Sequence, residues 1–172
     1  MTVVSNLSPL HYLVLVDCAP ILPRLFGVVV TPPAVMAEMS AANAPGPVRS
    51  WAASPPTWLV VAAPAVVEDI PRLGRGKRGA GEKAAIALAL ELGAAALLID
   101  DGRGIQEAHK RGLTTVRTLA LIDRAAESGF IDDLPDVLDR LFDGTSFHAG
   151  AEVWAIVAGM KERDRARKRS LG

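Results

Sequence analysis

Short apolar runs alternate with amphipathic stretches along this chain, and the pattern predicts strands that alternate with helices. Five runs are mostly apolar or β-branched and predict strands: residues 2–5, 28–31, 58–62, 95–99 and 114–116. Because parallel strands need long crossover connections, helical segments between successive strands predict an α/β fold with a mostly parallel sheet.

The segments between and after these runs have helical patterns, and several carry end signals. Ser8 is a predicted N-cap with Pro9 at the first helical position, and Gly27, Gly93 and Gly112 are typical helix-ending residues. The predicted helices are residues 9–16, 19–26, 33–42, 48–53, 82–92, 102–111, 119–128, 134–142 and 149–164. Residues 71–81, rich in glycine and basic side chains, predict an exposed loop.

The composition fits a folded domain with a sizeable core, since half of the 172 residues are hydrophobic. The 19 basic residues are balanced by 19 acidic ones, which argues against a globally basic nucleic-acid binder but allows a local basic patch. We predict one domain over residues 1–145, followed by a C-terminal helix with a basic tail over residues 146–172.

A cytoplasmic location is expected, because the single cysteine, Cys18, cannot form an internal disulfide. No signal peptide or membrane-spanning segment is recognisable, so we expect no membrane association.

Polar side chains follow two of the predicted strands. Asn6 follows the first strand, and Asp100 and Asp101 follow the fourth. Sites in open parallel sheets form at the carboxyl ends of strands, so these residues meet if the two strands are neighbours. Glu38 and Glu82 lie on predicted helices that could reach the same place. Carboxylate oxygens are the ligands that Mg²⁺ prefers, and a bound ion of this kind supports phosphodiester hydrolysis.

Each acid also has a purely structural interpretation. Glu82 in the first turn of a helix complements the helix dipole, and Glu38 could simply face solvent. Either Asp100 or Asp101 can be explained as a helix cap. Because a cap needs only one residue, capping does not explain the second acid.

Four motifs resemble a PIN domain in their order and spacing, mainly within the first 130 residues. They are residues 5–10 (SNLSPL), 33–38 (PAVMAE), 81–89 (GEKAAIALA) and 97–101 (LLIDD). The similarity is greatest to the DUF3368 branch, which resembles VapC toxins.

The resemblance implies a three-layer α/β/α sandwich and an endoribonuclease that depends on Mg²⁺ or Mn²⁺, often the toxin of a toxin–antitoxin pair. By motif match, the family's four acidic positions fall on Asn6, Glu38, Glu82 and Asp101, with Asp100 adjacent as a further ligand. Ser8 matches a hydroxyl residue that supports the site. The resemblance also suggests a homodimer and an antitoxin-like protein partner.

Asn6 stands where the family usually has aspartate. Its amide keeps a neutral oxygen that can bind a metal ion or a water, but one negative charge is lost. Weaker Mg²⁺ binding is the expected consequence.

Basic residues near the acids could hold RNA phosphates: Arg72, Arg75, Lys77, Arg78 and Arg103. A solvated loop is the plainer interpretation of most of them. The basic segment 161–169 is likewise either a solvated tail or a binding surface for RNA or an acidic partner.

The first hypothesis is therefore a metal-dependent endoribonuclease. The second is a PIN-like domain that is weak or inactive in catalysis and acts by binding RNA or an antitoxin-like protein, which Asn6 favours. A nucleotide-binding domain is the third, and the lack of a glycine fingerprint after the first strand counts against it.

Overall fold

Five short strands form one parallel sheet in the computed structural model, which describes residues 1–148 and 150–172. The strands are β1 (Val3–Ser5), β2 (Val29–Thr31), β3 (Leu59–Val61), β4 (Ala96–Leu98) and β5 (Thr115–Val116). Each predicted strand is confirmed and is one residue shorter at one or both ends. The sheet order is β3-β2-β1-β4-β5, so β1 lies at the centre between β2 and β4.

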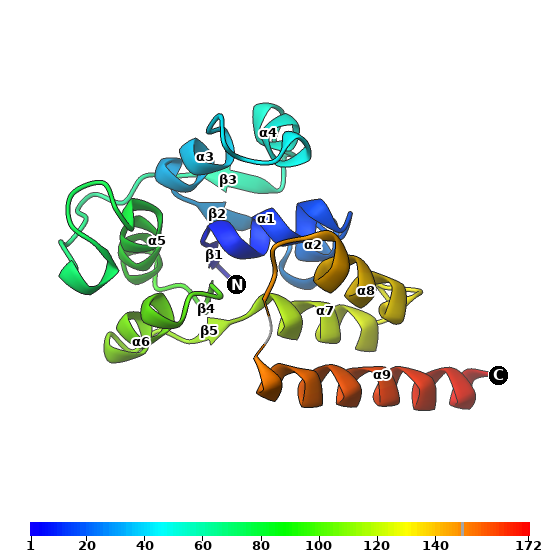
Figure 1. The fold of residues 1–172 in the computed structure, drawn as a ribbon. Helices are drawn as coiled ribbons and strands as arrows, with labels where there is room; N and C mark the ends of the chain where they lie inside the picture. The colour runs from blue at the N-terminus through cyan, green and yellow to red at the C-terminus, as the bar shows by residue number, and fades with distance from the viewer. Residues whose placement is uncertain (149) are drawn as a thin grey trace. The chain divides into compact units, whose positions relative to one another are not determined.

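The chain divides into two units, Met1–Thr118 and Leu119–Gly172, and the sheet belongs to the first. The domain boundary expected at residue 145 stays a prediction. The helices of the first unit are α1 (Leu7–Leu15), α2 (Ile21–Phe26), α3 (Pro33–Met39), α4 (Gly46–Ala53), the 3₁₀ helix η1 (Pro71–Leu73), α5 (Ala80–Glu91) and α6 (Gly102–Lys110). Figure 1 shows α5 and α6 on one side of the sheet and α1 and α2 on the other, which confirms the three-layer α/β/α architecture.

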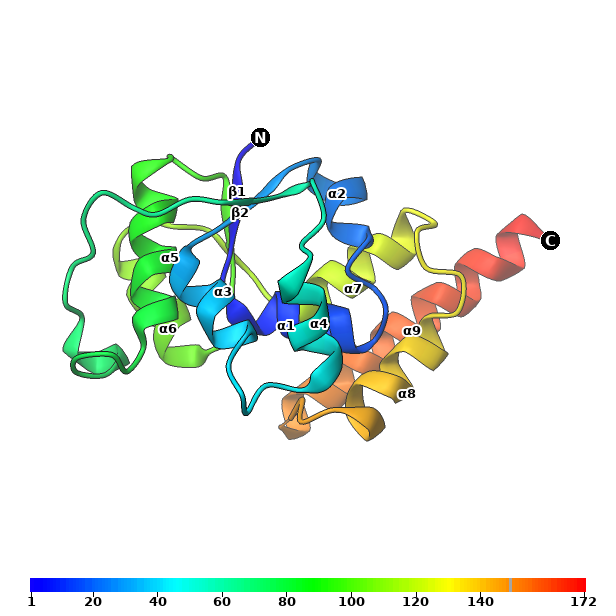
Figure 2. The ribbon, with the colours of Figure 1, turned by 90° about the horizontal axis from the view of Figure 1, so that it is seen from above.

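The three central strands, β1, β2 and β4, are mostly apolar and fully buried because both faces of the sheet are covered there. Val4 and Leu97 pack with Ile86 of α5 and Ile105 of α6 in one buried cluster. Successive side chains of a strand point to opposite faces, so Val3, which is also fully buried, belongs to the other face. The connection from β3 to α5 is the longest in this unit, and Figure 2 shows it passing around α5.

The predicted start of the first helix is wrong. The helix α1 begins at Leu7, with Ser8 and Pro9 as its second and third residues. Proline fits there because the first N–H groups of a helix have no partner within the helix. Asn6 takes the N-cap position, but its side chain makes no capping hydrogen bond.

Two other predicted bounds also change. The helix α3 ends at Met39 rather than at residue 42. The predicted loop 71–81 contains η1, and α5 already begins at Ala80. Gly27, Gly93 and Gly112 all have positive φ angles, as expected of residues that end helices.

The second unit contains α7 (Thr118–Glu127, which begins at the last residue of the first unit), α8 (Leu134–Gly144) and α9 (Ala151–Leu171). The predicted start of the last helix at residue 149 lies outside the described residues. Its predicted end at residue 164 is wrong, because α9 continues through the basic segment to Leu171. The carboxylate of Asp164 accounts for this, since it accepts a hydrogen bond from Arg167 (2.6 Å) and lies 3.1 Å from Lys168 Nζ.

Replacing Asp164 with asparagine is expected to destabilise the second unit at neutral pH. Burial alone would raise the pKa of Asp164, but Arg167 and Lys168 outweigh it and the pKa is lowered. A carboxyl with a lowered pKa stabilises the fold above its unfolded-state pKa, and that contribution disappears as the pH falls through its folded pKa. Urea unfolding should therefore separate Asp164→Asn from the native chain at pH 7 but not in strong acid. An equal difference at both pH values would contradict this account.

No helix within residues 1–148 or 150–172 is long and apolar enough to span a membrane.

Candidate functional site

The central strands bring the predicted polar residues to one edge of the sheet. β1 and β4 are parallel neighbours with Ser5 opposite Leu98, and Asn6 N donates a hydrogen bond to Leu98 O (2.9 Å). Asn6 and the pair Asp100–Asp101 therefore follow adjacent strand ends. The expectation that these two strands lie side by side is confirmed.

Asn6 is the least satisfied polar residue of this edge. It is 1% exposed, and neither Oδ1 nor Nδ2 has a hydrogen-bond partner among the described residues. A buried polar group without a partner costs about 1–3 kcal/mol of stability. Such a group in a native fold needs an explanation, and a bound ion or water at this position would supply one.

Glu38 and Glu82 come together because α3 packs against α5. The backbone N–H of Gly81 donates to Glu38 Oε1 (3.2 Å), which fixes the Glu38 carboxylate beside the first turn of α5. Burial raises the pKa of Glu38, and the nearby charge of Glu82 raises it further, against the Gly81 hydrogen bond. A cation bound between Glu38 and Glu82 would offset the repulsion between the two carboxylates.

Gly81 is the residue that allows this approach. A Cβ at position 81 would lie 2.6 Å from Glu38 Oε1, so any other residue displaces the carboxylate.

We expect Gly81→Ala to weaken divalent-cation binding several-fold while the protein stays folded, because alanine suits a helix better than glycine. Isothermal titration with Mn²⁺ measures the effect. Gly159→Ala in α9 is a control, since its Cβ would meet only the end of the Arg163 side chain, at 3.3 Å. Unchanged Mn²⁺ affinity in Gly81→Ala would show that the position of Glu38 does not matter.

Glu82 and Asp101 line the same cavity, about 170 Å³ in volume, together with Arg72, Arg103 and Gly79. Asp101 is the N-cap of α6, where its Oδ1 accepts a hydrogen bond from Gly104 N (2.8 Å). The cavity therefore combines two carboxylates with two guanidinium groups. Carboxylates can bind a metal cation, and arginine side chains can bind a phosphate. A site that binds and cleaves a phosphodiester needs both kinds of group.

Asp100 is directed elsewhere. Its two carboxylate oxygens accept hydrogen bonds from Thr118 N (2.8 Å) and Thr118 Oγ1 (2.6 Å). Burial raises the pKa of Asp100, while the Thr118 hydrogen bonds and Arg117 act in the opposite direction. Asp100 stays a predicted metal ligand, and these two hydrogen bonds show that its carboxylate also holds Thr118 at the start of α7.

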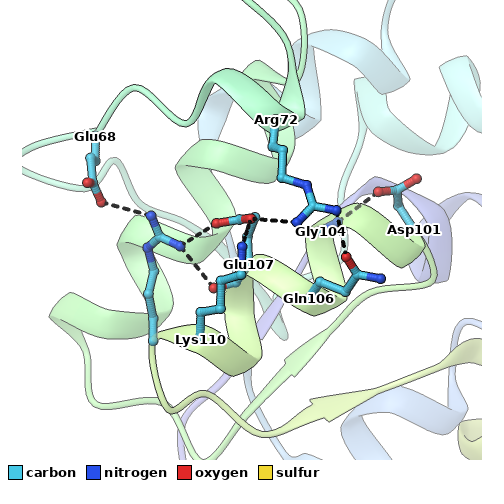
Figure 3. A network of polar contacts seen from close by, with 8 residues as sticks. Glu68, Arg72, Asp101, Gly104, Gln106, Glu107 and Lys110 are labelled. Carbon is cyan, nitrogen blue, oxygen red and sulfur yellow. Dashed lines mark hydrogen bonds and ion pairs between the residues drawn. The ribbon is translucent and has the colours of Figure 1, made fainter.

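The basic residues divide into two groups. Arg72 and Arg103 line the cavity. Arg75, Lys77 and Arg78 are exposed in the segment between η1 and α5 and do not line it. Figure 3 shows that Arg72 is tied to α6, where its Nη2 donates to Gln106 Oε1 (3.1 Å) and its Nη1 lies 3.9 Å from Glu107 Oε1.

The residues Gln106, Glu107 and Gly81 were not expected at the site. Part of this cluster could be recognised in the sequence, because an acid at Glu107 is followed three and four residues later by Lys110 and Arg111. That spacing predicts ion pairs along one face of a helix. Nothing in the sequence shows that Arg72, 35 positions earlier, joins the same carboxylate. That contact depends on how η1 packs against α6.

The donor set fits a hard divalent cation only in part. Within the described part of the chain, no three His, Cys, Asp or Glu side chains gather closely enough to hold a metal ion. The available donors, an unpartnered amide and carboxylates, are nevertheless oxygen ligands, and Mg²⁺ needs only one or two carboxylates when waters complete its shell. The chemistry of the residues therefore suits such an ion.

A larger cavity of about 540 Å³ lies between α5 and the chain segment before η1. Its walls include Val66, Ile70, Ile86 and Leu90, and it contains none of the predicted site residues. The converging acids distinguish the smaller cavity as the candidate site.

Comparisons with known proteins agree with this fold. Neither the curated proteins nor the solved structures give a match to this chain. The family model DUF3368, described as a PIN domain, matches residues 2–161. PIN domains are generally nucleases, and a match over nearly the whole length shows that this chain belongs to the DUF3368 family of PIN domains.

Proposed function

We propose that this protein is a metal-dependent endoribonuclease similar to VapC-type toxins, which hydrolyses RNA phosphodiesters. The observation that carries the proposal is the cavity in which Glu82 and Asp101 face Arg72 and Arg103. Membership of a nuclease family supports hydrolysis as the reaction class.

Asn6, Glu82 and Asp101 would hold Mg²⁺ or Mn²⁺ in this proposal, with Glu38 completing the acidic edge. When bound, such an ion supplies an activated water and stabilises charge that develops on the phosphate. Ser8 would support Asn6 from the second position of α1. Asp100 would be a further ligand from the adjacent position, and its two oxygens also accept hydrogen bonds from Thr118 at the start of α7.

The guanidinium groups would bind and orient the RNA. Arg72 and Arg103 line the cavity and would contact the phosphates nearest the reaction. Arg75, Lys77 and Arg78, exposed next to η1, would extend the contact along the backbone. The finer parts of the proposal, an antitoxin-like protein partner, a homodimer and a cytoplasmic location, follow the family resemblance.

A second candidate function is favoured by Asn6. A neutral amide at a position that usually carries an acid removes one charge from the ion site, which weakens cation binding. The alternative is a PIN domain that binds RNA or a partner protein with little or no cleavage.

Incubating the purified native chain with a panel of single-stranded RNAs separates the two candidates. The nuclease proposal predicts multiple turnovers with Mg²⁺ or Mn²⁺ and none with EDTA. RNA binding without cleavage, together with cleavage gained in Asn6→Asp, would reject the nuclease proposal for the native chain and support the binding function.

A further inference from the structure

One helix, α6, builds one side of the candidate cavity and also holds an arginine that belongs to another element. Asp101 caps its first turn and Arg103 lines the cavity. One turn further along, Gln106 and Glu107 both contact Arg72 of η1 (Figure 3). The position of Arg72 beside Glu82 and Asp101 is therefore set by α6.

Arg72 remains available for a ligand despite these contacts. Its side chain is 56% exposed. Among the residues that the structure describes, one of its five N–H donors makes a hydrogen bond, to Gln106, and the ion pair with Glu107 is long at 3.9 Å. The guanidinium is held in place while most of its donors can still bind an anion.

Glu107 does not neutralise Arg72, because it is shared among three cations. Its buried carboxylate, 6% exposed, also lies 2.7 Å from Lys110 Nζ and 2.8 Å from Arg111 Nη1. The hydrogen bonds from Lys110 and Arg111 lower the pKa of Glu107, so the carboxylate is charged at neutral pH. Arg111 is also paired with the exposed Glu68, at 3.2 Å. Arg72 is thus one of the exposed ends of a network whose central carboxylate, Glu107, is buried.

We infer that Glu107 and Gln106 are positioning residues, which hold the guanidinium of Arg72 where it binds an RNA phosphate beside Glu82 and Asp101. The inference rests on the proposed function, because it takes RNA as the ligand of this cavity. It assigns an RNA-binding role to two α6 residues that need not touch the RNA.

A purely electrostatic role for Glu107 predicts the opposite result. If Glu107 were only a negative charge near the RNA, Glu107→Gln would remove repulsion and strengthen RNA binding. If it positions Arg72, the same substitution weakens binding. The sign of the change therefore separates the two roles.

The test is a double-mutant cycle on binding of a fluorescent single-stranded RNA, measured in EDTA over a series of salt concentrations. Arg72→Ala should weaken binding several-fold and reduce the slope of log K against log salt by about 0.7, the loss of one phosphate contact. Glu107→Gln and Gln106→Ala should each reproduce part of this loss. Neither should weaken binding further when Arg72 is already alanine.

Gln106→Ala keeps the test informative if Glu107→Gln is unstable, because Gln106 is exposed. Lys110→Ala is the matched control: it removes another partner of Glu107, on a residue that does not line the cavity. It should leave the salt slope unchanged. Additive effects of Arg72→Ala and Gln106→Ala, tighter binding by Glu107→Gln, or no RNA binding by the native chain would each overturn the inference.

Cleavage measured separately keeps the two proposals apart. Native protein that binds RNA and shows the coupling, but does not cleave, would reject the nuclease proposal and uphold this inference. Native protein that cleaves RNA but shows additive effects would uphold the nuclease proposal and reject this inference.

Discussion

Replacing Asp101 with asparagine is expected to reduce RNA cleavage by at least about 100-fold, equivalent to about 2.7 kcal/mol of transition-state stabilisation. The substitution removes one of the two carboxylates that line the cavity with Arg72 and Arg103. Asparagine caps helices about as well as aspartate, so the hydrogen bond to Gly104 N can persist. The free energy of unfolding should therefore change by less than about 0.5 kcal/mol. Steady-state cleavage of one RNA, with urea unfolding of the same samples, measures both quantities.

Asp133→Asn is a matched control for this experiment. Asp133 caps α8 through a hydrogen bond from Asp136 N (3.0 Å), and it does not line the cavity. We expect its cleavage rate to equal that of the native chain. Glu82→Gln tests the other carboxylate of the cavity and should also lose cleavage. If both Asp101→Asn and Glu82→Gln cleave at the native rate, the reaction takes place elsewhere.

The second large effect is expected at Asn6, where stability and ion binding should change in opposite directions. Asn6→Leu replaces an unpartnered buried amide with an apolar side chain and should raise the free energy of unfolding of the metal-free protein by about 1–3 kcal/mol. Asn6→Asp buries an additional acid and should lower it by about 3 kcal/mol. Unfolding in EDTA measures both changes.

Divalent cations should then narrow the difference in stability between the two variants. Mn²⁺ at 100 times its dissociation constant adds about 2.7 kcal/mol to any variant that binds it only when folded. We expect the largest gain for Asn6→Asp, a smaller one for the native chain and the smallest for Asn6→Leu. Ser170→Ala in the last turn of α9 is a control, because it alters an exposed residue and should show the native gain. Equal gains in the native chain and both Asn6 variants would show that this side chain does not face the ion.

Much of the fold could be predicted because its signals are local. The strands β1, β2 and β4 are short apolar runs bounded by polar residues, prolines or glycines, and that pattern follows from burial on both faces of a parallel sheet. The neighbouring positions of Asn6 and Asp101 could also be expected, since polar residues that directly follow parallel strands share one edge of the sheet.

The rest depends on contacts between distant residues. Asp100 and Asp101 are chemically identical and adjacent, yet one binds Thr118 and the other lines the cavity with Glu82. That difference is set by the direction of the chain after β4 and by the start of α7. The basic segment after residue 160 similarly looked able to remain unstructured, but pairing with the buried Asp164 keeps it helical.

The double use of Asp101 has an evolutionary consequence. The same carboxylate caps α6 and lines the cavity. Asparagine can replace it as the helix cap, but asparagine does not supply its negative charge to the cavity. A single-nucleotide change converts an aspartate codon to an asparagine codon. Under the proposed function, one such change removes catalysis while the protein stays folded, and it leaves the proposed RNA-binding surface available for selection of a non-enzymatic role.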